Sequence, residues 1–234
     1  MKILAVDTST TSGSVALCTE DRVVAEWTLV SARTHNRRLL AGVDRILADA
    51  GWDLEEVDAF AVTVGPGSFT GIRIGLSTLK AMAWALGKPL YGVSTLEALA
   101  EPLATASLPV CPMVDARKKE IYAALYRPGA PGVLTEERPA AVLAPEAVAA
   151  WVNEAVVVCG DGWLEYRSRL RKILGEKLVD PGPGYHGIRA GNVGRIALRK
   201  MAAGAPSDPA DLVPTYIRPS EAEINNPHLA RSLA

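Results

Sequence analysis

The same order of expected strands and helices occurs twice in this sequence. Hydrophobic periodicity in the first hundred residues predicts three short strands, an amphipathic helix, a strand buried on both faces and an apolar helix. From about Leu108 that order begins again, although the residues of the two halves do not match. The sequence therefore predicts an α/β protein of duplicated β-β-β-α-β-α units, with a first lobe over residues 1–107 and a smaller second lobe over 108–205.

The end of the chain has a different character. Five of the 16 prolines fall in the last 29 residues, which predicts extended or irregular structure along the surface for a tail over residues 206–234. In the second lobe we expect a weak third strand over residues 133–138 and helices over 145–152, 162–174 and 192–203, the last of which closes that lobe.

Composition and charge exclude several classes of protein. The net charge is −1 and the pI is about 6.3, so there is no overall positive field to hold a nucleic acid backbone. Three cysteines lie far apart in apolar segments, which is typical of reduced, buried thiols rather than of disulfides. Residues 1–7 lack the features of a secretory signal, and no apolar run is long enough to span a membrane. We therefore expect a cytoplasmic protein.

A glycine-rich loop over residues 65–71 precedes a helix over 70–87 whose only charges are Arg73 and Lys80. The loop matches neither the P-loop nor the dinucleotide-binding pattern, so a tight connection between strand and helix is favoured over a phosphate site. A helix with so few charges is buried on more than one side. Either the fold covers both of its faces, or a partner protein covers one of them.

An acidic residue ends the first strand of each half: Asp7, followed by the turn residues Thr8, Ser9 and Thr10, and Asp115. Paired carboxylates at such strand ends could hold Mg²⁺, and the first turn could bind phosphate. This arrangement resembles the two-lobed actin, sugar kinase and Hsp70 ATPase superfamily, a ribonuclease H-like fold. The second turn has no glycine, so for Asp115 we favour pairing with Arg117 or capping a turn. A residual nucleotide site at Asp7, Thr8, Ser9 and Thr10 stays open.

Other catalytic chemistry finds little support. The three histidines, His35, His186 and His228, do not form a metal-ligand pair at helical spacing, and no serine lies in a nucleophile elbow. Two small basic clusters are typical of solvated faces, with RNA or an acidic partner as the alternative use. Their residues are Arg33, Arg37 and Arg38 in one cluster and Arg117, Lys118 and Lys119 in the other.

Six blocks of sequence, taken together, resemble the TsaB family of bacteria, also called YeaZ. They are MKILAVDTSTTSGSVAL at residues 1–17, VTVGPGSFTGIRIGLSTL at 62–79, PLYGVSTLEAL at 89–99, VDARKKEIY at 114–122, GDG at 160–162 and VPTYIRPSE at 213–221. The match covers most of the chain in the same order.

The resemblance implies an actin-like fold and a non-catalytic role in making threonylcarbamoyladenosine beside the tRNA anticodon. In that family a homologous partner, TsaD, holds the metal through a histidine pair and transfers threonylcarbamoyl from its adenylate to tRNA, and a small ATPase, TsaE, joins the pair. We therefore expect this chain to bind no cofactor alone, to form a homodimer without its partners, to meet tRNA only within the complex and to avoid membranes.

The resemblance also implies a partner interface on the two helices of the first lobe, without indicating which helix face is used. The residues expected there are His35, Arg38, Ala41, Gly42, Ile72, Gly75, Leu76, Leu79 and Ala83. Two other functions remain as alternatives. One is a nucleotide-dependent phosphotransferase or ATPase that uses Asp7, and the other is a metallopeptidase, for which the sequence supplies no ligand set.

Overall fold

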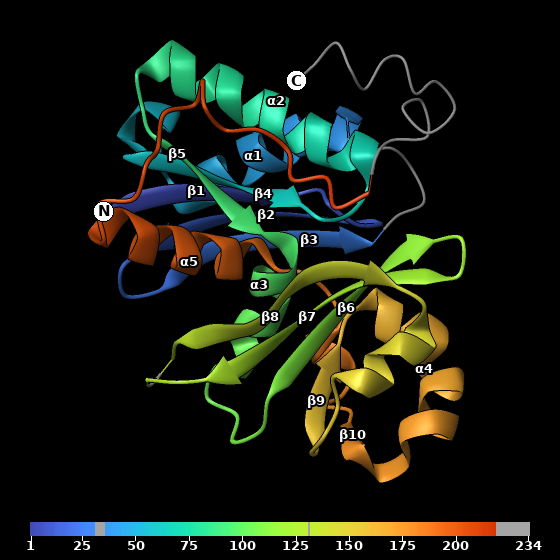
Figure 1. Cartoon of the computed structure of the whole chain (residues 1–234). Coiled ribbons are helices and arrows are strands. Elements are labelled where there is room, and N and C mark those ends of the chain that lie inside the picture. The colour runs from blue at the N-terminus through green and yellow to red at the C-terminus, as the bar shows by residue number, and fades with distance from the viewer. Residues whose placement is uncertain (31–35, 131, 219–234) are drawn as a thin grey trace.

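A computed structural model describes residues 1–30, 36–130 and 132–218 and contains two five-stranded sheets (Figure 1). The first sheet has the strand order β3-β2-β1-β4-β5. Its central strands β1 and β4 are almost continuously apolar and buried, because the sheet carries helices on both faces. The bounds are β1 (Lys2–Asp7), β2 (Ser12–Thr19), β3 (Val23–Val30), β4 (Ala59–Gly65) and β5 (Leu90–Ser94).

The second sheet repeats this arrangement, with the order β8-β7-β6-β9-β10. In each sheet the first three strands of the half are antiparallel neighbours, the fourth strand pairs in parallel with the first, and the fifth pairs in parallel with the fourth. The predicted duplication and the predicted two-lobed fold class are therefore confirmed. The bounds are β6 (Val110–Arg117), β7 (Glu120–Pro128), β8 (Leu134–Leu143), β9 (Val156–Cys159) and β10 (Leu178–Val179).

Helices form three layers around the sheets. Helices α1 (Asn36–Ala50) and α2 (Phe69–Leu86) cover the outer face of the first sheet, and α4 (Asp161–Leu174) covers the outer face of the second. Helices α3 (Thr95–Ala100) and α5 (Ala190–Ala202) pack between the two sheets, in one hydrophobic cluster with side chains from both (Figure 1). None of the helices in the described ranges is long and apolar enough to cross a membrane.

The position of α5 differs from the sequence expectation. We expected this helix to close the second lobe, but it packs across β1 and β2 of the first sheet. A Cβ atom on Gly194 would overlap the sulfur of Cys18, so glycine permits this close approach of helix and strand. Periodicity predicts the apolar face of a helix without saying which sheet that face covers.

The second half also differs in three local details. The helix expected over residues 145–152 is a short 3₁₀ helix, Pro145–Ala150. The weak third strand is longer than expected and forms β8. Strand β10 was not expected, because two residues are too few to produce a periodic pattern. The other 3₁₀ segments are Leu54–Glu56, Glu101–Leu103, Gly175–Lys177 and Pro183–Tyr185.

Residues 206–218, which we call the C-terminal segment, contain neither helix nor strand, as their prolines predicted. The segment runs across α2 and β5 in Figure 1. The backbone N–H of Leu90 donates to the carbonyl of Ser207 at 2.9 Å, and the N–H of Thr215 donates to the carbonyl of Val64 at 2.7 Å. These bonds attach the segment to the edge of the first sheet.

Candidate functional site

The glycine-rich loop packs directly on the turn that follows β1. A Cβ atom on Gly67 would overlap the carbonyl oxygen of Ser9, and one on Gly71 would overlap that of Thr8. The N–H of Ser68 donates to the carbonyl of Ser9 at 2.7 Å, and the hydroxyl of Thr8 donates to the carbonyl of Gly71 at 2.7 Å. The glycines therefore allow one backbone to lie against another, which is the tight connection that the sequence favoured.

Asp7 lies beneath this contact. One oxygen of its carboxylate accepts hydrogen bonds from the N–H of Ser9 at 3.1 Å, the hydroxyl of Ser9 at 2.6 Å and the hydroxyl of Thr63 at 2.7 Å. Asp7 and Ser9 are fully buried, Thr8 is 1% exposed and Thr10 is partly exposed. In the expected nucleotide site, Thr8 and Ser9 therefore lie against the loop and Asp7 is buried, while Thr10 is partly exposed. A phosphate group could reach Ser9 only if the loop moved, and nucleotide binding there stays a prediction.

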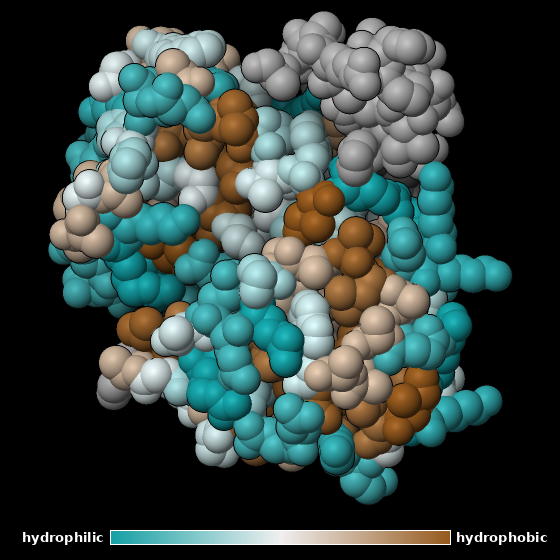
Figure 2. Space-filling model, in the orientation of Figure 1, coloured by the Kyte–Doolittle hydropathy of each residue, from teal (hydrophilic) through white to brown (hydrophobic). Residues whose placement is uncertain are grey.

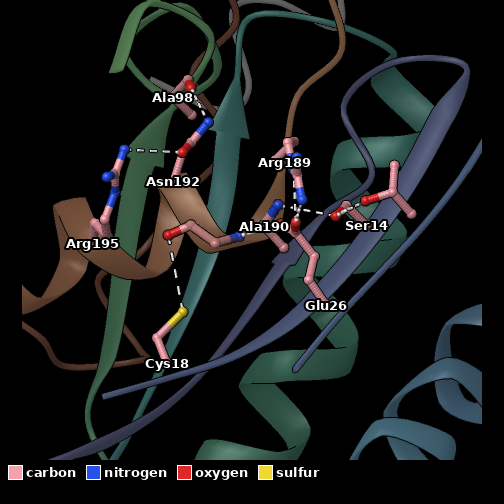
Figure 3. Close-up of polar contacts among 10 residues, drawn as sticks. Ser14, Cys18, Glu26, Ala98, Arg189, Ala190, Asn192 and Arg195 are labelled. Atoms are coloured by element: carbon pink, nitrogen blue, oxygen red, sulfur yellow. Dashed lines mark hydrogen bonds and ion pairs between the residues drawn. The ribbon is translucent and has the colours of Figure 1, made fainter. Parts of the chain in front are cut away.

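The first turn of α5 is a second place where an anion could bind, because the backbone N–H groups of a helix N-terminus favour negative charge. Here the chain supplies the acceptors (Figure 3). The N–H of Ala190 donates to the hydroxyl of Ser14 at 2.9 Å, and the N–H of Gly191 donates to the carboxylate of Glu26 at 2.8 Å. The guanidinium of Arg189 also binds Glu26. A carboxylate from β3 therefore occupies this helix terminus.

Asp115, the acidic residue at the corresponding strand end of the second half, has partners of its own. Its carboxylate accepts from the N–H of Arg117 at 2.9 Å and pairs with the guanidinium of Arg117 at 3.1 Å. Pairing with Arg117, one of the two roles that we favoured, is therefore confirmed. Burial raises the pKa of the adjacent Asp161, whose carboxylate accepts from the N–H of Asp115 at 3.0 Å. Within the described ranges, no three histidine, cysteine or acidic side chains gather as metal ligands.

The hairpin between β6 and β7 has an unusual backbone. Arg117, Lys118 and Lys119 have φ angles of 62°, 52° and 65°, and in the part of the chain that the structure describes they are the only residues besides glycine with positive φ. Such a conformation costs a non-glycine residue about 1–2 kcal/mol. The turn contains no glycine, and its sequence carries no signal that three residues in a row adopt the conformation that glycine favours.

Helix α2 points most of its expected interface residues into the molecule. Ile72, Leu79 and Ala83 are at most 1% exposed and Leu76 is 6% exposed, all against the first sheet, and Gly75 packs on Thr8. A partner protein cannot reach these side chains in the folded chain. The exposed positions of α2 are instead Phe69, Thr70, Arg73, Ser77, Ala81, Trp84 and Ala85.

Helix α1 supplies the remaining expected residues. Arg38 is half-buried and Ala41 is exposed, whereas Gly42 is buried, with the ring of Trp27 3.1 Å from where its Cβ would lie. His35 lies outside the described residues. That a partner binds these two helices stays a prediction, with Ala41 and the exposed side of α2 as the accessible contacts.

The C-terminal segment covers part of the side of α2 that faces away from the sheet. The rings of Phe69 and Tyr216 stack with centroids 4.8 Å apart, and the guanidinium of Arg73 lies 3.8 Å from the centre of the Phe69 ring. Arg73 also donates to the hydroxyl of Tyr216 at 2.8 Å. Figure 2, in the orientation of Figure 1, shows hydrophobic surface between hydrophilic areas in the upper part of the view, where α2 lies. The sheet and the C-terminal segment therefore cover two sides of α2. Trp84, which is 60% exposed, lies on the side that stays uncovered.

The three cysteines are buried and free, as expected. Burial raises the pKa of Cys18 and of Cys111 to about 12, and raises the pKa of Cys159 further. Because the thiolate is the reactive form, these groups are unsuited to nucleophilic catalysis.

Comparisons with known proteins agree with this fold and sequence pattern. The family model described as TsaD, tRNA N6-adenosine threonylcarbamoyltransferase, matches residues 28–142. The Bacillus subtilis protein named tRNA threonylcarbamoyladenosine biosynthesis protein TsaB is 31% identical over 229 residues, which are 95% of this chain and 96% of that protein. The chain belongs to the TsaB family.

A second TsaB, from Escherichia coli, is 38% identical over 168 residues, 70% of this chain and 72% of that protein. The solved structure of YeaZ from Pseudomonas aeruginosa has a TM-score of 0.80 and 33% identity, and the match covers 92% of this chain and 99% of that one. These matches confirm the TsaB resemblance, and the solved structure supports the fold class.

Proposed function

We propose that this chain is a non-catalytic subunit of the machinery that makes threonylcarbamoyladenosine in tRNA. In this proposal it binds and activates a TsaD-type subunit, which transfers threonylcarbamoyl to the adenosine next to the anticodon, and a TsaE-type ATPase joins them. The names of its relatives support the pathway. Buried, free thiols suit a reducing compartment, so we place this work in the cytoplasm.

The observation that carries the non-catalytic role is the packing of the glycine-rich loop on the turn after β1. Phosphoryl transfer needs backbone N–H groups that face the phosphates and an accessible carboxylate for the metal. In this chain Gly67 and Gly71 lie against the carbonyl groups of that turn, and Asp7 is buried beneath them. The carboxylate of Glu26 occupies the N-terminus of α5 in addition. ATP and threonylcarbamoyl-adenylate are therefore assigned to the partner complex.

The exposed side of the α1 and α2 layer supports a protein partner. It carries Leu40, 52% exposed, and Trp84, together with the small residues Ala41, Ala81 and Ala85. Large exposed apolar side chains beside small ones suit close contact with another protein. The TsaD family model matches residues 28–142, which include both of these helices, so a TsaD-type partner can carry related helices. Related surfaces can pair about a twofold axis, and a second copy of this chain can take the same place.

Co-purification with the TsaD homologue of the same organism tests this proposal. We expect a stable complex, and we expect Trp84→Glu to abolish it while the circular dichroism spectrum and the melting temperature stay as in the wild type. Leu164→Glu on α4, at an exposed apolar side chain of the second lobe, is the matched control and should leave the complex intact. A complex that survives Trp84→Glu would place the interface elsewhere.

Calorimetric titration with ATP and Mg²⁺ separates the scaffold from the enzyme alternative. We expect no binding at micromolar nucleotide by the isolated chain. Micromolar affinity that is lost in Asp7→Asn would show that the chain is a nucleotide-dependent enzyme and not a scaffold. A cooperative melting transition must first show that the variant is folded.

A further inference from the structure

The C-terminal segment begins on the first lobe, where it is attached at several points. The carbonyl of Ser207 accepts a hydrogen bond from the N–H of Leu90 at 2.9 Å, and the carbonyl of Ala210 accepts one from the ammonium of Lys80 at 3.4 Å. The side chain of Leu212 packs against the hydrophobic cluster between α2 and the first sheet. The start of the segment is therefore bound to both α2 and the edge strand β5, along which it runs in Figure 1.

Further along, the segment covers one side of α2. The N–H of Thr215 donates to the carbonyl of Val64 at 2.7 Å. The next residue, Tyr216, stacks its ring on Phe69 and accepts a hydrogen bond from Arg73 at 2.8 Å. Phe69 and Arg73 would therefore become more exposed if the segment moved away from the helix.

Arg218, at the end of the segment, reaches the second lobe. Its guanidinium donates to the carboxylate of Glu120 at 2.6 Å and to the carbonyl of Ala116 at 3.0 Å. The side chains of Arg218 and Glu120 are 22% and 38% exposed, so water and salt reach this ion pair. An ion pair of this kind contributes little stability and is weakened by screening. Arg218 thus fastens the segment to the second lobe by a contact that can open at a small cost.

The remaining contacts of the segment are also of a kind that opens easily. The segment has no helix or strand of its own, and its bonds to the first lobe are few and spread along its length. Parts of a protein with few buried contacts open below the free energy of global unfolding, as contiguous cooperative units. One short piece of chain carries all of these contacts, so each of them holds the chain in place for the next.

We propose that the C-terminal segment is a strap that opens and closes as one unit, with the pair of Arg218 and Glu120 as its latch. Opening of the strap uncovers the edge of β5 and the side of α2 that carries Phe69 and Arg73. Because the latch is an ion pair that salt can reach, ionic strength shifts the balance between the closed and open forms. The strap is independent of the proposed function, since all of its contacts lie within this chain.

Native-state hydrogen exchange of the full-length chain tests the strap, because two backbone amides donate across its boundary. They are the N–H of Leu90, bonded to Ser207, and the N–H of Thr215, bonded to Val64. In Arg218→Gln we expect both amides to exchange roughly fivefold faster, and by the same factor. Leu90 is the decisive reporter, because its partner lies at the opposite end of the segment from the latch. The amides of β1 should exchange as in the wild type.

Two further measurements identify the ion pair as the latch. Glu120→Gln removes the other partner and should speed both amides by the same factor as Arg218→Gln. Raising the salt concentration to about 1 M should speed both amides relative to those of β1 in the wild type, and should have a smaller effect in Arg218→Gln. The matched control is Arg127→Gln, which breaks arginine–glutamate pairs elsewhere on β7 and should leave both amides unchanged.

Three results would overturn the strap. Faster exchange of Thr215 without Leu90 would mean that the end of the segment frays and does not open as one unit. Unchanged exchange of both amides in Arg218→Gln would mean that the ion pair is no latch. Equal acceleration of the β1 amides would mean that Arg218 stabilises the whole fold. No partner protein is present in these measurements, so their outcome is separate from the co-purification that tests the proposed function.

Discussion

The carboxylate of Glu26 accepts a hydrogen bond from the backbone N–H of Gly191, across 165 positions of sequence. The side chain comes from an outer strand of the first sheet, and the amide belongs to the first turn of the last helix. Beside it, the hydroxyl of Ser14 accepts from the N–H of Ala190. The first turn of α5 is thus capped by side chains from two strands rather than by its own preceding residue, Arg189.

This capping predicts the effect of Glu26→Ala. Loss of a carboxylate at a helix N-terminus, together with its pairing to Arg189, should lower the free energy of unfolding by about 1–2 kcal/mol. Urea denaturation followed by circular dichroism measures the change. Glu26→Gln keeps an acceptor for the N–H of Gly191 and should lose less of the free energy of unfolding. Equal stability of Glu26→Ala and the wild type would show that the cap contributes nothing.

A substitution in the glycine-rich loop tests the packing on which the proposed function depends. In Gly71→Ala the new Cβ would overlap the carbonyl oxygen of Thr8, a backbone atom that cannot move without shifting the turn. We expect a loss of about 2 kcal/mol or more in the free energy of unfolding, in the range of other overpacked positions. Gly184→Ala is the control, because no atom lies within 4 Å of its added Cβ. Similar denaturation midpoints for the two variants would contradict the close contact.

The two sides of α2 should respond differently to truncation. Leu76→Ala removes a buried side chain from the core beneath the helix and should cost about 2–5 kcal/mol of stability. Trp84→Ala changes an exposed side chain and should leave the melting temperature within a few degrees of the wild type, because surface changes have small effects. Differential scanning calorimetry compares them. A large loss in Trp84→Ala would mean that its ring packs against the chain itself.

Asp180 predicts one part of the acid sensitivity of the fold. Burial alone would raise the pKa of this carboxyl, but hydrogen bonds from the indole of Trp163 and the N–H of Gly182, both 2.9 Å, together with His186, lower the pKa overall. A lowered pKa in the folded state stabilises the protein above the ordinary carboxyl pKa, and that stabilisation is lost as the pH falls through the folded value.

The test is the free energy of unfolding between pH 6 and about pH 3. In Asp180→Asn the decline with falling pH should be shallower than in the wild type, and the stability near neutral pH should be lower. Asp211→Asn, which removes a carboxyl in the C-terminal segment, controls for the loss of one negative charge. Parallel curves for the wild type and Asp180→Asn would contradict the assigned pKa shift.

Local sequence predicted the elements well where a pattern was long. The helix expected over residues 70–87 is α2, which differs from it by one residue at each end. This segment is long and apolar, and it has the cap residues Ser68 and Gly87. The two-residue β10 carries no such signal.

The candidate site was predictable only in part. The pairing of Asp115 with Arg117 could be expected because both lie in one turn. The bonds of Glu26 to Arg189 and Gly191 could not, because nothing in either segment signals a partner so distant in sequence. The sequence left open which face of α2 meets a partner, so it could not predict that Leu76 is buried. A helix with few charges has two apolar sides, and only the arrangement of the sheet determines which side is inward.

The return of α5 to the first sheet makes the second sheet an insertion within the first structural unit. The chain builds β1 to β5, leaves to build β6 to β10, and then comes back to cover β1 and β2. Cutting the chain at a single point between the sheets would therefore remove α5 from the layer that it covers and expose Ala5, Ala16 and Cys18. The packing of the first sheet is therefore complete only with residues 190–202, which follow the second sheet in the chain.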